Sequence, residues 1–433
     1  MKHLLGLLLL FPFYLALAQE ALPISKDEVI LKVRENNTTL KMAQQDILAA
    51  KGNFNQTNAV ILPDISVSYT GIATTNPLMA FGSKLNQEIL TQADFDPSIL
   101  NDPGQVEDYA TRIEVRQPLL NFDGIYQRKA AKAKWTAVQM QSERSGDFME
   151  LEVAKAYMRL QLAYKAVEVL EKAKETALEN KRVADNNFKH GYLQKSDVLA
   201  VEVRVTELDN QLQYAKSNIL NASNYLSVLM DDDSYRILRP TDSLSVAYNP
   251  ITATDLSGNR KDILAMDATT EAYEQMYKAD KMAFLPRLNA FGIYELHDDQ
   301  IFRADANGYL FGAELKWNLF EGSKRFGKTQ KSKAEYDKSI FQLEQYKAES
   351  QLELNKAQRG LEDAKNKLKL TKLALQQSRE SLRIRTNRFE QGLEKTTDLL
   401  LAETQYSQKQ LAYYTTIFQH NYALAYLNFL TKE

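Results

Sequence analysis

The sequence predicts a mainly helical, internally duplicated protein with a smaller β part of four strands per chain. Three observations indicate this fold class: a long repeat without gaps, two very long segments that lack helix-breaking residues, and four short segments in which apolar and polar residues alternate. The 433 residues include only 16 Gly and 10 Pro, whereas average usage would give roughly 30 and 20. Few turn-forming residues imply few turns and long elements.

The repeat is clearest around two Phe-x-x-Gly segments. NNFKHGYLQKSDVLAVE, around Phe188, matches NRFEQGLEKTTDLLLAE, around Phe389. Identical residues recur at one constant offset, in the pairs Gly191 and Gly392, Asp197 and Asp398, and Glu202 and Glu403. Two copies of one long unit predict a pseudo-symmetric chain. We expect a first repeat in residues 19–230, an irregular equatorial connector in 231–254 and a second repeat in 255–433.

The first 18 residues are predicted to be a signal peptide. An apolar run from Leu4 to Leu17 follows Lys2, and Ala16-Leu17-Ala18 offers a cleavage site of small residues. A membrane anchor is the alternative, but the run is shorter than the ~20 residues that a spanning helix needs. The chain contains no Cys, which excludes disulfides and an acylated N-terminal Cys. We therefore expect an exported protein without a lipid anchor.

Long helices are expected through most of the remaining chain. Ser25 and Glu28 form a potential capping box at the start of a helix that extends to about residue 58. Residues 125–188 and 324–388 show apolar residues at three- and four-residue spacing, and a rise of about 1.5 Å per residue would make each helix about 95 Å long. Shorter returning helices are expected in residues 194–229, 255–283 and 395–430. Their largely polar surfaces suit either a solvated coiled coil or the wall of a water-filled tube.

The four alternating segments are predicted to be strands. Residues 65–70, 111–116, 288–295 and 309–317 carry apolar residues on one face, and a loop is expected in 76–108. We expect each alternating segment to belong to a strand of about ten residues, which is the length of a tilted membrane strand; an ordinary half-buried sheet is the alternative. Four strands cannot close a barrel, since about eight is the practical minimum, and open edges are not tolerated in lipid. If these strands lie in a membrane, several chains must share one barrel, with Tyr69, Tyr309 and Trp317 as interfacial aromatics.

Several motifs resemble those of the TolC-type outer-membrane efflux family. They are Leu62-Pro63, the segment from Gln117 to Gly124, the segment from Trp317 to Gly322, and the two Phe-x-x-Gly tips with their downstream Asp. The resemblance implies a homotrimer in the outer membrane of a Gram-negative cell, with a shared 12-strand β-barrel and a long α-helical barrel in the periplasm. It also implies an exit duct that passively exports drugs, metals or proteins from an inner-membrane pump of RND or ABC type through a periplasmic adaptor.

The resemblance also assigns roles at the tips. Adaptor contacts are expected at Gly191, Tyr192, Gly392 and Leu393. Asp398 matches one acidic residue of the constriction, whereas the second acidic position is Leu401. Ser196 and Asp197 match acceptors of the lock that holds the family's tunnel shut, but the Tyr and Arg donors correspond to Phe389 and Glu394. We therefore expect closure by other contacts or a looser tip, with Lys195 or Lys395 as a substitute cation.

A structural role for the two tip aspartates is the alternative. Asp197 and Asp398 both fall in the first turn of an expected helix, where an anion is favoured by ~0.3–1 kcal/mol.

Other classes of function lack support in the sequence. The four His residues show no metal-site spacing, and no phosphate loop, nucleophile elbow or catalytic triad is present. Asp231-Asp232-Asp233 fits a solvated acidic turn better than a calcium site. A formal net charge of −2 without a basic patch argues against nucleic-acid binding. We expect a protein that is not an enzyme and needs no cofactor; the alternative to an exit duct is a non-conducting surface coiled coil or adhesin.

Overall fold

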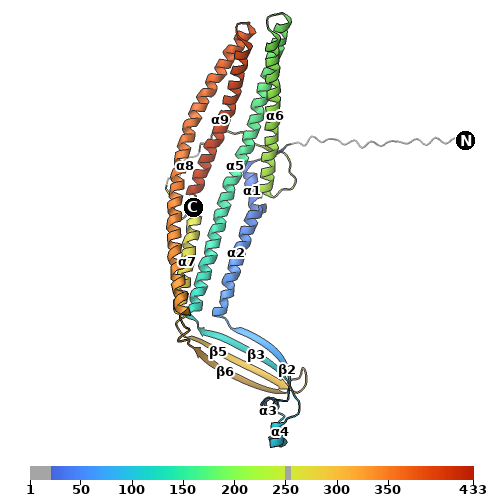
Figure 1. Cartoon of the computed structure of the whole chain (residues 1–433), viewed down its shortest axis with the longest axis vertical. Coiled ribbons are helices and arrows are strands. Elements are labelled where there is room, and N and C mark those ends of the chain that lie inside the picture. The colour runs from blue at the N-terminus through green and yellow to red at the C-terminus, as the bar shows by residue number, and fades with distance from the viewer. Residues whose placement is uncertain (1–20, 249–254) are drawn as a thin grey trace, which may run out of the picture. The chain divides into compact units, whose positions relative to one another are not determined.

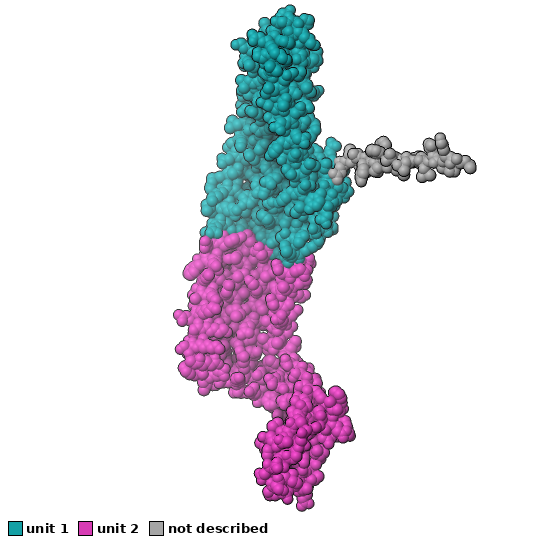
Figure 2. Space-filling model, turned by 45° about the vertical axis from the view of Figure 1, so that its right-hand side comes forward, with its two compact units in different colours: residues 1–43, 142–260, 348–433 teal, residues 44–141, 261–347 magenta. Residues whose placement is uncertain are grey.

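A computed structural model describes residues 21–248 and 255–433. The predicted signal peptide and part of the predicted connector lie outside these residues. The chain divides into two compact units, which Figure 2 distinguishes by colour. Unit 1 contains the described residues up to 43 together with 142–260 and 348–433, and unit 2 contains 44–141 and 261–347. Each unit takes segments from both predicted repeats, whose boundaries stay a prediction.

Unit 1 is built from two helical hairpins. The ends of the long helices α5 (Phe122–Lys189) and α8 (Lys324–Glu390) turn back into α6 (Lys195–Met230) and α9 (Thr396–Thr431), as Figure 1 shows. Gly191 and Gly392 close the two turns at φ +77° and +72°, the left-handed region that glycine adopts at helix ends. The predicted apolar stripe of α5 is confirmed, because Val153, Tyr157 and Leu160 are buried.

The expected single helix from Ser25 to about residue 58 is wrong. It is divided into α1 (Lys26–Asn36) and α2 (Thr38–Gln56) at Asn37. The Asn37 side chain accepts hydrogen bonds from the amides of Thr39 and Leu40 at 3.0 and 3.2 Å and donates to the carbonyl of Leu229 at 2.8 Å. An Asn side chain that caps a new helix competes with helix continuation. Ser25 does cap α1, but Glu28 pairs with Lys32.

Short segments complete unit 1. Strand β1 (Leu22–Ile24) pairs in parallel with β4 (Leu238–Pro240), which lies in the predicted connector. Asp231 ends α6 in the left-handed conformation at φ +56°. These segments place the connector against the middle of α5, where Tyr164 donates to the carbonyl of Leu238 at 2.9 Å.

Unit 2 contains the four predicted strands in one antiparallel sheet of order β2-β3-β5-β6. The strands are β2 (Asp64–Thr74), β3 (Val106–Leu120), β5 (Arg287–Asp298) and β6 (Ala306–Lys316). β2, β3 and β5 extend beyond the predicted segments at both ends, and β6 begins earlier than predicted. Trp317, which was expected to continue the last strand, lies one residue beyond β6 and donates from its indole nitrogen to the carbonyl of Phe284 at 3.0 Å.

The segment 76–108, expected to be a loop, contains helical turns, so that expectation is wrong. They are α3 (Pro77–Asn86), the 3-10 helix η2 (Gln92–Phe95) and α4 (Pro97–Asn101). Asn76 and Asp96 act as N-caps directly before a proline at the first helical position, which is a strong local helix-start signal.

Helices α2 and α7 (Lys261–Met282) accompany the first parts of α5 and α8 in unit 2. The Phe-x-Gly motif links this bundle to the sheet. Asp123 of the motif is buried and pairs with Arg287 at the start of β5, with Nε 3.0 Å from Oδ1. Among the described residues, no helix combines the length and apolar character that a membrane crossing requires.

Candidate functional site

The sheet of unit 2 has one apolar face that extends across all four strands. Val67 lies opposite Ile113, Ile113 opposite Tyr294, and Tyr294 opposite Tyr309. Val67 and Tyr309 are 68% and 77% exposed in the single chain. A continuous apolar row of this kind needs a cover of lipid or protein.

The opposite face carries charges on β3. Arg112 donates to Glu295 at 2.9 Å and lies 3.4 Å from Glu114, which also pairs with Arg116. The polar character is not uniform, because Phe291 and Ile293 lie opposite Arg116 and Glu114 in the register. The alternation predicted from the sequence is therefore clear on β2 and β3 and weaker on β5 and β6.

The predicted interfacial aromatics lie at both ends of this sheet. Tyr69 stacks on Tyr109 and Phe302, with ring centroids 6.5 and 5.4 Å apart, and its hydroxyl accepts from the Phe302 amide at 2.8 Å. Tyr309 is close to the same end of the sheet, whereas Trp317 follows the other end. Their role at a membrane interface stays a prediction.

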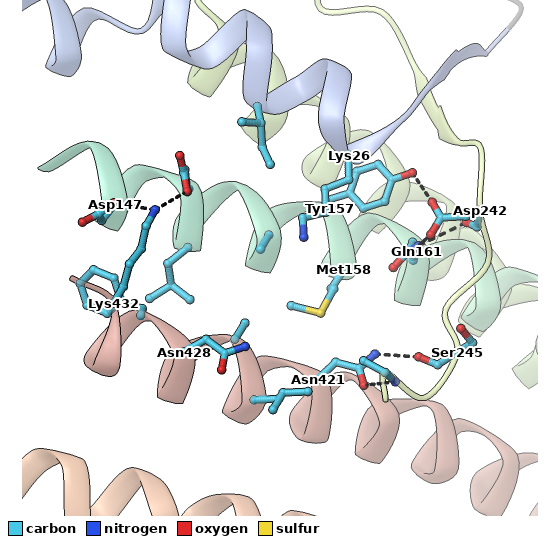
Figure 3. A pocket seen from close by; sticks show the side chains of 18 of the residues that line it. Lys26, Asp147, Tyr157, Met158, Gln161, Asp242, Ser245, Asn421, Asn428 and Lys432 are labelled. Atoms are coloured by element: carbon cyan, nitrogen blue, oxygen red, sulfur yellow. Dashed lines mark hydrogen bonds and ion pairs between the residues drawn. The ribbon is translucent and has the colours of Figure 1, made fainter. Parts of the chain in front are cut away.

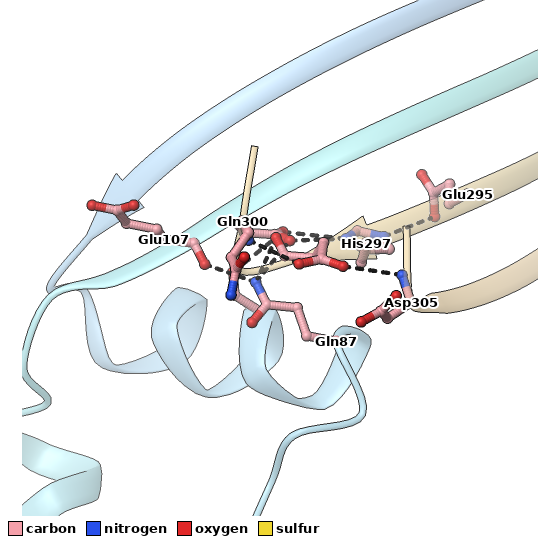
Figure 4. Close-up of polar contacts among 9 residues, drawn as sticks. Gln87, Glu107, Glu295, His297, Gln300 and Asp305 are labelled. Carbon is pink, nitrogen blue, oxygen red and sulfur yellow. Dashed lines mark hydrogen bonds and ion pairs between the residues drawn. The ribbon is translucent and has the colours of Figure 1, made fainter. Parts of the chain in front are cut away.

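A buried polar cluster fastens α3 to the ends of β3 and β5 (Figure 4). Gln87 Nε2 donates to Asp108 Oδ1 at 3.0 Å and to the carbonyl of Glu107 at 2.7 Å. His297 Nδ1 lies 3.1 Å from Asp108 Oδ1. All three side chains that meet here are buried, so loss of one partner would leave a desolvated polar group. Sequence analysis missed this cluster because its members are far apart in the chain.

The tip of the first hairpin places its acidic residue as a helix cap. Asp197 Oδ2 accepts from the Gln194 amide at 3.1 Å and completes a capping box at the start of α6. Ser196 and Tyr192 are exposed, and Lys195 lies over the Phe188 ring at 5.7 Å. Asp197 therefore has the helix-capping role that is the structural alternative for this residue; a gating role stays a prediction.

The tip of the second hairpin holds a charge cluster that sequence analysis missed. Glu394 Oε1 lies 2.6 Å from Arg385 Nη1, and Glu394 Oε2 lies 2.8 Å from Arg388 Nε. Arg385 Nη1 is also 3.9 Å from Asp398. The two arginines are three residues apart in the last turns of α8, where cations are favoured by the helix dipole, so a search of that turn for basic residues would have found them.

The remaining predicted tip residues differ in exposure. Phe389 is buried at 2% exposure, whereas Leu393 and Leu401 are 63% and 54% exposed. Of the two positions where the lock donors were expected, Phe389 is buried and Glu394 is paired with arginines of its own hairpin. Arg385 and Arg388 of α8 supply the cations next to Glu394, and Arg385 also lies near Asp398. Lys195 or Lys395 as a substitute cation for the lock stays a prediction.

A cavity of about 430 Å³ lies in unit 1 between α1, α5, α9 and the connector (Figure 3). Lys432 bridges Asp147 and Glu150 at 2.6 and 2.9 Å on one side. On the other side Asn421 donates to the carbonyl of Ser245 at 2.7 Å, and Gln161 donates to Asp242 at 3.0 Å. These contacts hold the connector against the helices. Within residues 21–248 and 255–433, no group of metal-ligating side chains is present.

Comparisons with known proteins agree on one family and one fold. A sequence model of the family described as outer membrane efflux protein matches residues 29–230 and 253–428. No curated protein sequence matches the chain.

Three of the solved structures with the same fold are outer-membrane proteins. The CmeC outer membrane channel of Campylobacter jejuni is 17% identical with a TM-score of 0.80, over 94% of this chain and 85% of that chain. The outer membrane protein VceC of Vibrio cholerae is 18% identical with a TM-score of 0.78, over 93% and 95%. The MtrE outer membrane channel of Neisseria gonorrhoeae is 16% identical with a TM-score of 0.78, over 94% and 88%. At such low identity the likeness shows the fold, and it confirms the predicted mainly helical class with a β part.

Proposed function

Because this chain belongs to the outer membrane efflux protein family, we propose that three copies of it form the exit duct of a tripartite export system. The copies share one β-barrel in the outer membrane and one helical tunnel in the periplasm. The duct binds no cofactor and catalyses no reaction, so the energy for export comes from an inner-membrane pump of RND or ABC type. A periplasmic adaptor connects that pump to the helical tips.

The open sheet of unit 2 carries this proposal. Its apolar face spans all four strands, and β2 and β6 are both edge strands without a further partner in the described chain. In lipid each unpaired backbone group costs several kcal/mol, and four strands are about half of the practical minimum for a barrel. Joining the edges of several copies removes this cost. The charged side chains of β3 then face a wet interior, and the apolar row faces lipid.

The helical tips supply the contacts to the periplasmic partners. Gly191, Tyr192, Gly392 and Leu393 are the adaptor-contact residues that we assign, and all four are exposed at the turns. Tyr192 is 80% exposed, as is appropriate for a group that binds a partner through an aromatic ring. The cargo is small molecules such as drugs or metals, or a protein, and the pump determines which.

Asp398 is assigned to the constriction. Its side chain is 47% exposed, and among the described residues its ion-pair partner is Arg385 at 3.9 Å. One carboxylate per chain gives a ring of three in the proposed trimer, next to Leu401, which adds no charge. Such a ring attracts cations into a narrow passage.

Single-channel recording in planar bilayers tests the duct and its constriction together. The purified protein is expected to form discrete conducting steps, and external divalent cations should block them. Asp398→Ala should weaken this block about tenfold, because it removes the carboxylate ring. The control is Glu380→Ala, which removes an exposed carboxylate of α8 that is not assigned to the constriction, so the block should not change.

Two results would contradict the proposal. Unchanged block in Asp398→Ala would mean that Asp398 only stabilises the start of α9. A protein that never conducts, and that is monomeric and compact without detergent, would favour a structural coiled coil or adhesin.

A further inference from the structure

A buried carboxylate lies where α9 packs on the first hairpin of unit 1. Glu403 is 6% exposed, and Asn180 of α5 donates a hydrogen bond to its Oε1. Arg204 of α6 is equally buried, yet it donates to Ser407 at 3.4 Å and pairs with Glu207 at 3.4 Å. Among the described residues, Glu403 Oε2 and Arg204 Nε both lack a hydrogen-bond partner. The carboxylate is therefore held at a helix interface with only part of the hydrogen bonding that its charge needs.

The internal repeat shows that this environment is specific to one hairpin contact. Glu202 is the residue of the first repeat that corresponds to Glu403. Its side chain is 41% exposed and pairs with Lys181 at 3.3 Å. The same residue type at the same position of the two repeats is thus solvated and paired in one case, and desolvated in the other.

The groups around Glu403 come from four helices. A small cavity of about 40 Å³ beside it is lined by Lys172 of α5, Arg204 of α6, Leu382 of α8 and Tyr406 of α9, among others. Lys172 is turned to Glu175 at 2.7 Å and is largely exposed, so Arg204 is the one buried cation close to the carboxylate in the described chain. This volume holds at least one water molecule, which needs about 10–15 Å³.

We propose that Glu403 is a proton-binding site that fastens α9 to the first hairpin when it is protonated and loosens this contact when it is ionised. A neutral carboxyl satisfies the Asn180 amide without a buried charge, and its hydroxyl can donate to water in the cavity. The ionised form demands fuller hydration than the cavity of about 40 Å³ allows, so it favours movement of α9 away from α5 and α6. This property goes beyond passive export, because it makes the packing of the hairpins depend on pH.

The direction of the pH effect follows from burial. Burial raises the pKa of Glu403 from 4.5 to about 7, although Arg204 and Asn180 act in the opposite direction. A raised pKa means that the packed state binds the proton more tightly than a solvated state does. The packed state is therefore most stable below pH 4.5 and loses stability as pH rises to about 7. Above that pH the effect levels off.

Distance measurements between the two tips test this proposal. The chain has no native Cys, so spin labels at His190→Cys and Glu390→Cys report on the two hairpins alone. One labelled copy is diluted into unlabelled full-length protein, and tip distances are recorded from pH 4.5 to 8. We expect the ratio of separated to packed tips to rise at least about tenfold over this range, because one pKa unit corresponds to a factor of ten.

Three variants make the test specific. Glu403→Gln mimics the neutral carboxyl, so its tips should stay packed at every pH. Glu202→Gln is the matched control and should behave like the parent protein. Arg204→Gln removes the stabilising cation and should increase the fraction of separated tips at pH 7 without changing it at pH 4.5. This variant keeps the proposal testable if Glu403→Gln does not fold.

Two outcomes would overturn the proposal: tip distances that do not change with pH, or a pH response that survives in Glu403→Gln. No current is measured, so either outcome leaves the exit-duct proposal standing. Conversely, if the protein never conducts, the spin-label distances still test the Glu403 contact.

Discussion

At the scale of single residues, the second tip shows how one carboxylate organises a turn. Glu394 is bound by Arg385 and Arg388 and follows Gly392, whose positive φ reverses the chain. Its side chain is only 10% exposed, so these pairs are less screened than surface ion pairs. Glu394 therefore makes its charged contacts within its own hairpin.

Glu394→Gln should loosen the second tip. Loss of two charged contacts is expected to speed amide hydrogen exchange at residues 388–396 by about 3- to 10-fold, since each partly exposed pair contributes up to about 1 kcal/mol. Glu390→Gln is the control, because Glu390 is exposed and lies just before the turn. Equal exchange in both variants and the parent would mean that the glycine turn alone fixes the tip.

At the scale of elements, Asn37 determines where one helix ends and the next begins. Asn37→Ala removes the cap of α2 and leaves the buried carbonyl of Leu229 without its donor. We expect a loss of about 1–2 kcal/mol, seen as a lower Tm in detergent and faster exchange at Thr39 and Leu40. Asn36→Ala, one residue earlier and exposed, should change neither.

This helix break illustrates what sequence patterns can predict here. The long helices and the four strands followed from periodicity, because packing of one face against a neighbour requires regular spacing. The break at Asn37 cannot be predicted from helix-breaking residues, because no Pro or Gly marks it. The helical turns of 76–108 were missed because Asn, Asp and Pro are typical of loops as well as of helix starts. The charge cluster of Glu394 was missed for another reason. The resemblance implies contacts between the two hairpins, whereas Arg385 and Arg388 lie in the same hairpin as Glu394.

At the scale of the whole molecule, the sheet edges provide the contact through which copies join in the proposed assembly. β2 and β6 end the sheet order, and the register places Ser68 of β2 and Gly308 of β6 in the same row as Arg112 and Glu295. If the edges of neighbouring copies pair, each β2 meets the β6 of the next copy. Repetition of this one contact must close into a ring, because an open edge in lipid leaves backbone groups unsatisfied.

Oxidative cross-linking of the two edges tests this closure. Cysteines at Ser66 or Ser68, combined with cysteines at Gly308 or Leu310, should yield covalent trimers and nothing larger under mild oxidation in membranes. The control pair is Ile113→Cys with Tyr294→Cys, which face each other within one sheet and should cross-link without forming oligomers. A ladder of products beyond three copies would mean that the contact propagates instead of closing. Monomers alone, in every edge combination, would mean that β2 and β6 do not meet between copies, and the shared barrel would have to be abandoned.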